Sequence, residues 1–383
     1  MSSDVIVIGG GIIGLSTAYE LLRLGATVTL LERNRCGREA SWAGAGILSP
    51  LLPWDYSDPV TQLTRLSNRL YPQFIETLRA ETGIDSEYEA SGMLVLEPST
   101  DSEGPEGQAE SARRAAIAEH WCMSRDFPLQ KVRSREVESA LARDQAALRL
   151  PDICQVRNPR LLSALLTAVK KSGIILENAE VIDWETANGR VQSVTTRSGE
   201  KHAAAVYVVA AGAWSRVLLG EHAHKLEIWP VRGQILLFKA QEGLVRAIVV
   251  KDRENFYLIP RRDGHVLAGS TIEQAGFGNR ITSQARETLL AQAHALVPGL
   301  REETLVAQWA GLRPGSMDNI PVIDRHPALS NLYLNGGHYR YGVTMAPASA
   351  QLAVNLILNR PQPLEVAPYR WRSGAIADPH SSS

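Results

Sequence analysis

The sequence has almost no excess of charge of either sign. Its 383 residues include 40 lysines and arginines against 41 aspartates and glutamates, which gives a formal net charge of −1. No block of basic residues interrupts this balance. Proteins that bind nucleic acid or an acidic membrane surface usually carry a basic excess or a basic block, so we expect neither partner.

Long apolar runs are also missing. A helix that crosses a bilayer needs roughly 20 consecutive apolar residues, and the longest candidate covers only about residues 206–214. We therefore expect no stable membrane association. The first strand is expected to begin at Asp4, which leaves no room for a signal or transit peptide.

Cysteine is scarce. The three cysteines, Cys36, Cys122 and Cys154, are odd in number, lie far apart and form no CxxC pair. A disulfide framework is therefore not expected, and this usage fits the reducing cytosol. We predict a cytoplasmic protein.

Two common catalytic signatures are absent as well. The nine histidines form no HExxH motif and no cluster with cysteine or acidic residues, so no metal site is expected. No G-x-S-x-G elbow occurs, which argues against a serine hydrolase of that type.

A glycine-rich turn stands at the start of the chain. Residues 4–8 form a short β-branched run, and the sequence GGGIIG from Gly9 follows at once. Apolar residues at spacings of three and four then predict a helix that Gly25 ends, and residues 27–31 predict a second buried strand. The segment is a βαβ unit of roughly 30 residues.

The glycines of this turn match G-x-G-x-x-G, the pattern of a dinucleotide site. Gly9 permits the tight turn, Gly11 lets the backbone approach a pyrophosphate, and Gly14 allows the helix to lie close to the strand. The helix N-terminus offers unpaired N–H groups to the phosphates. Glu32 ends the second strand, where an acid accepts hydrogen bonds from a ribose. These features predict a dinucleotide site without separating FAD from NAD.

The middle of the chain alternates between helix and loop signals. Residues 60–81 predict a helix that Pro72 kinks or divides. The polar segment 97–109 is expected to be an exposed loop. A further helix is expected over residues 158–171, with Asn158 as its cap and a proline at its first position.

The second half is rich in strands. Residues 189–199 predict a hairpin and residues 205–210 a buried strand. Four apolar runs between residues 228 and 269 predict a mostly antiparallel sheet. A short strand over residues 332–334 and a helix over about 348–358 follow.

The segment GREASWAGAGILSPLLPW, residues 37–54, resembles the flavin-contacting loop of the D-amino-acid-oxidase-like flavoproteins, most closely that of the glycine oxidases linked to thiamine biosynthesis. Further stretches match in the same order and extend the resemblance over nearly the entire chain. They are VRNPRLL from Val156, AAGAWS from Ala210, PVRGQILLF from Pro230, YLIPRRDGHVLAGST from Tyr257, WAGLRPGS from Trp309 and GGHYRYG from Gly336.

The resemblance implies an α/β fold (α+β overall) with two domains. A Rossmann-type FAD-binding domain is assembled from separated segments, and a substrate domain is built on a largely antiparallel sheet. The expected FAD-binding segments are residues 1–85, 150–225 and 320–365, and the expected substrate-binding segments are residues 86–149 and 226–319.

The resemblance also implies which residues contact FAD. Small residues suit the flavin-contacting loop because backbone N–H groups must come close to the ring. The turn from Gly336 to Thr344 is expected to cover the pyrimidine side of the flavin, and it holds no cysteine, so FAD is expected to be non-covalent. The expected cofactor residues are Gly9, Gly11, Ile12, Ile13, Gly14, Glu32, Arg33, Ala40, Ser41, Ala45, Gly46, Ile47, Val181, Gly212, His338, Tyr339, Arg340, Tyr341, Gly342, Val343 and Thr344.

Three residues carry the expected substrate chemistry. Arg313 in GLRPG matches the arginine that holds the substrate carboxylate, and a guanidinium fork can do so bidentately. Arg340 matches a second position on the substrate side, and Tyr257 matches a tyrosine whose hydroxyl adds a hydrogen bond to the carboxylate. No residue is nominated as a general acid or base, and His338 is expected to be structural.

Several positions depart from the pattern or leave it open. Tyr341 stands where relatives often carry asparagine, and Ala45 lies in a loop that is often all glycine at its centre. Asn255 and Ile272 are expected to flank the pocket, where their size influences which side chains fit. These positions bear on substrate preference and not on the cofactor.

The implied function is oxidative deamination of glycine and other small amino acids, such as sarcosine and small D-amino acids. The products are glyoxylate or a keto acid, ammonia and hydrogen peroxide, and the reaction is expected to feed thiamine biosynthesis. The partners are the amino acid and oxygen, and a homo-oligomer is expected. The cofactor supplies the hard chemistry, and the protein mainly orients the substrate.

Three other functions stay open at this level. One is a D-amino-acid or sarcosine dehydrogenase that passes electrons to a quinone, and a second is an NAD-dependent dehydrogenase. The third is a non-catalytic flavin-binding subunit, against which the retained Arg313 and Arg340 argue. One methyl group in an apolar pocket shifts selectivity by only about 1–3 kcal/mol, so the sequence does not rank the small substrates.

Overall fold

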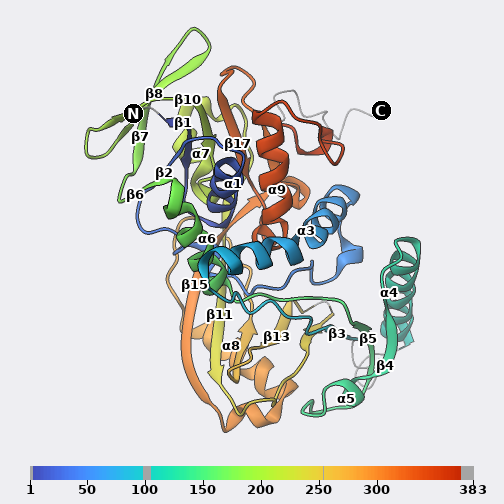
Figure 1. Ribbon diagram of the computed structural model, residues 1–383. Helices are drawn as coiled ribbons and strands as arrows, with labels where there is room; N and C mark the ends of the chain where they lie inside the picture. Colours follow the sequence, from blue (N-terminus) through green and yellow to red (C-terminus); the bar gives the residue numbers. More distant parts are fainter. Residues whose placement is uncertain (1–2, 98–104, 253, 372–383) are drawn as a thin grey trace, which may run out of the picture.

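The computed structural model describes residues 3–97, 105–252 and 254–371. Within these ranges no helix combines the length and the hydropathy that are needed to span a bilayer. Two large sheets dominate the molecule, one in its upper half and one in its lower half as drawn in Figure 1.

The first large sheet has six strands in the order β16-β17-β10-β1-β2-β6. All neighbouring strands are parallel except β16 and β17, which are antiparallel. Every residue of β2 is buried, as expected for a parallel sheet that is covered on both faces. The strands are β1 (Ser3–Ile8), β2 (Val28–Glu32), β6 (Ile174–Glu177), β10 (Ala204–Val209), β16 (Val322–Arg325) and β17 (Leu332–Gly336).

Four long helices accompany this sheet. Helix α1 packs against α9 and α6, and α3 packs against the same two helices (Figure 1). The apolar residues of α1, α6 and the parallel strands form one continuous core. The helices are α1 (Ile12–Arg23), α3 (Asp58–Thr82), α6 (Asn158–Ser172) and α9 (Gly342–Ile357).

The second large sheet has eight strands in the order β15-β11-β14-β13-β12-β3-β5-β4. Its pairs are antiparallel except β3 with β12. The strands are β3 (Met93–Leu96), β4 (Gln130–Arg133), β5 (Ala146–Leu150), β11 (Ile228–Lys239), β12 (Ile248–Lys251), β13 (Phe256–Pro260), β14 (His265–Gly269) and β15 (Thr304–Ser316). The expected combination of a parallel sheet and a largely antiparallel one is confirmed.

The remaining elements are short or peripheral. Strands β7 (Val181–Ala187), β8 (Arg190–Thr196) and β9 (Lys201–His202) form a three-stranded sheet, so the hairpin expected over residues 189–199 is present but extends from residue 181 to residue 202. The other α-helices are α2 (Ala40–Ala43), α4 (Pro105–Ser124), α5 (Ser134–Val137), α7 (Ser215–Leu219) and α8 (Ser283–Leu296). The 3-10 helices are η1 (Pro53–Asp55), η2 (Gly212–Trp214), η3 (Gly220–Ala223), η4 (Pro298–Arg301), η5 (Met317–Asn319) and η6 (Ala367–Tyr369).

Three local expectations are wrong. Residues 98–104 of the expected loop lie outside the described residues, but from Pro105 the chain is helical, because α4 buries Ala118, Trp121 and Cys122 against the eight-stranded sheet. Asn158 is not a helix cap, since Arg157 holds that position and the Asn158 side chain points to another segment. Helix α9 begins at Gly342 rather than near residue 348.

We propose that the two large sheets are the centres of the two expected domains, with the boundaries given above. The strands of the six-stranded sheet come from three separated stretches of the chain. Residues Ile47, Leu51 and Trp54, which follow the first stretch, pack into the core of the eight-stranded sheet.

Pro347 lies inside α9, which explains a buried contact of Tyr71. A proline has no N–H to donate to the carbonyl four residues earlier, here that of Val343. The Tyr71 hydroxyl donates a hydrogen bond to this Val343 carbonyl, and the Tyr71 side chain is fully buried. Helix α3 therefore supplies the bond that α9 cannot make for itself.

We expect Tyr71→Phe to lower the free energy of unfolding by about 1–3 kcal/mol, because it leaves a buried carbonyl without a donor. The measurement is denaturant unfolding of the wild type and the variant. Pro347→Ala provides the control, since alanine restores an N–H to Val343. In that background the cost of Tyr71→Phe should fall; an equal cost in both backgrounds would contradict the assignment.

Candidate active site

A cavity of about 430 Å³ runs from the parallel sheet to the antiparallel one. Ligand sites typically have volumes of about 300–1,000 Å³. One end lies at the carboxyl ends of β1, β2, β10 and β17, where open parallel sheets bind their ligands. The other end reaches Gly233, Tyr257 and Arg313 on the antiparallel sheet. A molecule bound here contacts both sheets.

The glycine-rich turn has the geometry that its sequence predicts. A Cβ atom on Gly14 would lie 1.9 Å from the Gly9 carbonyl oxygen, so only glycine lets α1 approach the turn. Gly9 has a φ of 115°, which also requires glycine. Gly11 borders the cavity, and a Cβ there would meet only the Ser41 hydroxyl at 3.1 Å. The backbone at Gly11 is therefore open to a ligand.

Glu32 holds this turn in addition to bordering the cavity. Its Oε2 accepts the Gly10 N–H at 2.7 Å and its Oε1 accepts the Asn34 N–H at 3.0 Å. The Ile12 N–H, in the first turn of α1, donates to the Ser41 hydroxyl at 2.9 Å. The acid at the end of β2 thus fixes the glycine-rich turn that borders this end of the cavity.

An aromatic contact that the sequence reasoning missed lies at the same end. The Arg33 guanidinium stacks over the Trp214 ring at 3.7 Å from its centroid and pairs with Glu39 at 2.8 Å. Trp214 borders the cavity beside Gly212. The AAGAWS stretch contained this tryptophan, but only the fold shows that it stacks on Arg33.

Residues 40–47, apart from Trp42, form one wall of the cavity, and three of their carbonyls accept hydrogen bonds from side chains of other segments. The Asn158 amide donates to the Ser41 carbonyl at 2.8 Å, the Trp309 indole to that of Ala43 at 3.0 Å, and Arg261 to that of Ala45 at 2.7 Å. These three side chains come from α6, β15 and the turn after β13. None was among the expected site residues, because their partners are remote in sequence.

Arg313 lies where a carboxylate could reach it. Its Nη2 donates to the Ser270 hydroxyl at 2.8 Å and its Nη1 to the Thr271 carbonyl at 3.1 Å. A Cβ on Gly233 would lie 2.1 Å from the guanidinium, so this glycine makes room for it. Burial lowers the pKa of Arg313. No ion pair joins it to an acid in the described part of the chain.

Tyr257 and Arg340 lie at the same end of the cavity. Tyr257 is buried at 4% exposure, and Arg340 donates to the Asn255 side-chain carbonyl at 3.0 Å. Asn255 therefore contacts a residue of the site, although neither Asn255 nor Ile272, which is 43% exposed, borders the cavity itself.

Tyr341 is buried at the cavity wall, with its ring edge-on to Tyr56 at 5.0 Å between centroids. The two hydroxyls are hydrogen-bonded to each other. Burial raises the pKa of both tyrosines. Tyr56 was not among the expected site residues, since it precedes α3 and meets Tyr341 only in the fold.

All expected cofactor and substrate residues but two border the cavity. Gly14 packs against Gly9 behind the turn, and the Thr344 hydroxyl donates to the Ile47 carbonyl at 3.0 Å. The residues that border the cavity are Gly9, Gly11, Ile12, Ile13, Glu32, Arg33, Ala40, Ser41, Ala45, Gly46, Ile47, Val181, Gly212, Tyr257, Arg313, His338, Tyr339, Arg340, Tyr341, Gly342 and Val343.

The site fits a dinucleotide cofactor. Asn158 and Asn335 both border the cavity, are at most 1% exposed, and carry side-chain carbonyls without a hydrogen-bond partner among the described residues. Buried acceptors of this kind are usually satisfied, so a bound group can supply the missing donors. Among the described residues, no group of histidine, cysteine or acidic side chains could hold a metal ion.

His338 is buried at 1% exposure and its Nε2 contacts the Ser349 hydroxyl at 2.8 Å. Burial lowers the pKa of His338 to about 3. The ring is therefore neutral at neutral pH, which agrees with a structural role.

This pKa predicts a loss of stability in acid. The unfolded chain binds a proton on this histidine below about pH 6.5 and the folded protein does so only near pH 3, so the stabilisation is complete above pH 6.5 and falls as the pH drops. The expected slope is up to about 1.4 kcal/mol per pH unit. Unfolding free energies at pH 4 to 7 should show a weaker pH dependence in His338→Asn. The exposed His120→Asn is the matched control, and an equal slope in both variants would contradict the prediction.

Comparison with known proteins agrees with this geometry. A family model described as FAD dependent oxidoreductase matches residues 4–356. The chain is 41% identical to the glycine oxidase of Pseudomonas aeruginosa over 96% of this chain and 98% of that protein. It is 34% identical to the bifunctional protein ThiO/ThiG of Synechocystis over 94% of this chain and 52% of that protein.

A solved structure is similar over the whole length. The glycine oxidase from Geobacillus kaustophilus superposes with a TM-score of 0.91 at 28% identity, covering 98% of this chain and 99% of that one. The sequence match, the matched fold and the glycine-rich turn all indicate the same family. The chain belongs to the family of FAD-dependent oxidoreductases that includes the glycine oxidases.

Proposed function

We propose that this protein is an FAD-dependent oxidase of glycine and other small amino acids, including sarcosine and small D-amino acids. One observation carries the proposal: Arg313 borders the same cavity as the glycine-rich turn and has no acidic partner among the described residues. A partly buried guanidinium without a counter-ion is suited to an anionic ligand. The relatives named glycine oxidase support the choice of a small amino acid.

The protein's own residues mainly bind and orient the substrate. Arg313 holds the carboxylate with its guanidinium fork, and Tyr257 adds a hydroxyl donor beside it. Arg340, held by Asn255, supplies a second positive charge on the same wall. No general acid or base is assigned, and the substrate amine must be neutral when the C–H bond breaks. Orientation of this kind can supply much of the rate enhancement.

FAD would be held non-covalently by the residues that border the cavity and would supply the oxidation: two electrons and one proton from the α-carbon, with a second proton from the amine, would in the end reduce oxygen to hydrogen peroxide. The imine product hydrolyses in water to glyoxylate, or to a keto acid, and ammonia. The balanced reaction consumes one oxygen and one water for each hydrogen peroxide and ammonia formed.

Tyrosines restrict the substrate end of the cavity. Tyr257, Tyr339 and Tyr341 all border it, and the Tyr339 N–H donates at 2.8 Å to the carbonyl of Pro314, the residue that follows Arg313. Bulky rings around the carboxylate anchor favour substrates with little or no side chain. This is the basis for placing glycine first.

The wider setting is part of the same proposal. The ThiO/ThiG relatives support a role in supplying thiamine biosynthesis. The three cysteines are free, with two of them buried, which fits a reducing cytoplasm. We also propose a homo-oligomer.

The test is peroxide production and oxygen uptake by the purified protein with glycine, sarcosine, D-alanine and D-proline. Turnover of glycine with peroxide supports the oxidase. Reduction of the yellow flavin by substrate without peroxide would favour a dehydrogenase that uses a quinone. A protein that lacks flavin absorbance and is active with NAD would refute the assignment of FAD as the cofactor. A bound flavin that none of the substrates reduces would favour a non-catalytic flavin-binding subunit.

A further inference from the structure

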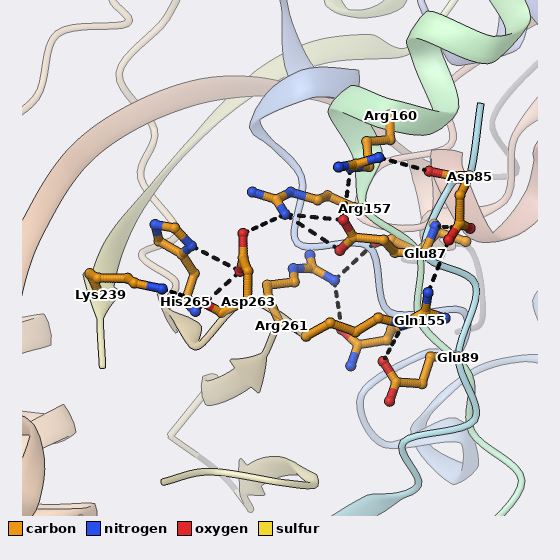
Figure 2. Close-up of polar contacts among 12 residues, drawn as sticks. Asp85, Glu87, Glu89, Gln155, Arg157, Arg160, Lys239, Arg261, Asp263 and His265 are labelled. Atoms are coloured by element: carbon orange, nitrogen blue, oxygen red, sulfur yellow. Dashed lines mark hydrogen bonds and ion pairs between the residues drawn. The ribbon is translucent and has the colours of Figure 1, made fainter. Parts of the chain in front are cut away.

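Arg261 is a charged side chain that serves only neutral acceptors. It follows β13, and its Nη1 donates to the Gln155 Oε1 at 2.6 Å and to the Val156 carbonyl at 3.0 Å. Its Nη2 donates to the Ala45 carbonyl at 2.7 Å. Figure 2 shows the guanidinium among the residues that surround it. Burial lowers the pKa of Arg261 to about 10, so it remains charged at neutral pH.

The acids nearest to Arg261 are engaged by other side chains, and one of them, Glu89, is contacted by Arg262 at 3.5 Å. Arg157 contacts Glu87 at 3.1 Å and Asp263 at 2.8 Å, and Arg160 contacts Glu87 at 2.7 Å (Figure 2). His265 lies 2.9 Å from Asp263. Among the described residues no acid forms an ion pair with Arg261. Its positive charge therefore acts on the oxygens that it binds, one of which is the Ala45 carbonyl at the cavity wall.

The bond to Ala45 acts on a peptide group at the cavity wall. In a trans peptide the C=O and the following N–H point in opposite directions. The Ala45 carbonyl faces Arg261, so the N–H of Gly46 points the other way, on the side where Ala45 and Gly46 border the cavity. A charge-assisted hydrogen bond is roughly twice as strong as a neutral one, and it polarises the groups that are linked to it.

We propose that Arg261 is a positioning residue that orients and polarises the Ala45–Gly46 peptide, so that the Gly46 N–H binds the reduced cofactor more strongly than the oxidised one. The inference rests on the FAD site of the proposed function. Electron density on the cofactor rises on reduction, and a strengthened donor then stabilises the reduced form. The bound flavin becomes easier to reduce and the amino acid easier to oxidise.

The matched control is the neighbouring arginine. Arg262 lies in the same turn, is exposed, and contacts Asp85 at 3.0 Å, Glu89 at 3.5 Å and the Tyr88 carbonyl at 3.1 Å. It does not border the cavity. Arg262→Gln removes one arginine from this turn without touching the Ala45 carbonyl, whereas Arg261→Gln removes the charge that faces it.

The experiment measures the midpoint potential of the bound flavin by dye-equilibrated chemical reduction of the holoenzyme. Arg261→Gln is expected to reduce the preference for the reduced cofactor about tenfold, a downward shift of about 30 mV for a two-electron couple. Arg261→Lys keeps the charge without the fork and is expected to shift the potential about a third as far in the same direction. Arg262→Gln should leave the potential unchanged.

An unchanged potential in Arg261→Gln would overturn the proposal and leave Arg261 as a structural contact; an equal shift in Arg262→Gln would also overturn it. If Arg261→Gln does not retain flavin, the midpoint potential of Arg261→Lys is the test instead, and an unchanged potential in that variant would overturn the proposal. The titration needs no amino acid, so it is independent of whether glycine is the substrate. A wild-type protein without bound flavin would instead refute the proposed function.

Discussion

Replacing Arg313 by alanine is expected to lower kcat/KM for glycine by roughly 30-fold to several thousand-fold, since breaking a buried charge pair costs about 2–5 kcal/mol. The guanidinium is fixed by the Ser270 hydroxyl and the Thr271 carbonyl before any substrate arrives. The carboxylate therefore meets an anchor that is already oriented. Without it, the α-carbon has no defined position and the amine end is free to rotate.

Arg313→Lys is the informative companion variant. Lysine keeps the positive charge but offers no planar fork, so it should recover only part of the activity. Steady-state kinetics with glycine and sarcosine measure both variants. Flavin absorbance should stay normal in each, because Arg313 lies at the substrate end of the cavity. Wild-type kcat/KM in Arg313→Ala would exclude the carboxylate anchor.

Gly14→Ala is expected to destabilise the protein by at least about 3 kcal/mol and to prevent isolation of the flavin-bound form. The new Cβ would lie 1.9 Å from the Gly9 carbonyl oxygen, which is backbone and cannot rotate away. Helix α1 must then separate from the turn. Both the core of the parallel sheet and the phosphate-facing N–H groups depend on that contact.

Gly11→Ala separates folding from cofactor binding at the same motif. Its Cβ would meet only the Ser41 hydroxyl, at 3.1 Å, but it would enter the cavity. This variant should unfold near the wild-type temperature when both are stripped of flavin, yet bind FAD much more weakly. Thermal unfolding and flavin fluorescence measure the two effects. A soluble Gly14→Ala with wild-type flavin content would refute the packing argument.

Local patterns predicted the elements whose signals lie within a few residues. The βαβ unit with its glycines and the antiparallel strands from Ile228 to Gly269 were expected and are present, and the hairpin expected over residues 189–199 is part of a longer one that begins at β7. Their signals are turn residues and apolar periodicity, which act over the length of one element. Both expected arginines, Arg313 and Arg340, border the same end of the cavity.

The errors arose where packing overrides a local signal. Glycines near residue 337 indicated a long turn, but α9 begins at Gly342 because its residues are buried against α1 and α3. Pro347 lies inside this helix, where the Tyr71 hydroxyl from α3 donates to the Val343 carbonyl that the proline cannot serve. The expected Asn158 cap is instead a donor to Ser41. Each correction depends on a partner far away in sequence.

By itself, the sequence determined the dinucleotide motif, the fold class and the family resemblance, because each depends on short stretches of neighbouring residues. Only the tertiary structure decided how the wall at residues 40–47 is held. Its carbonyls bond to Asn158, Arg261 and Trp309, which lie 117, 216 and 266 residues from their partners. Such bonds leave no trace in local periodicity, since a buried carbonyl requires a donor but does not specify which segment provides it.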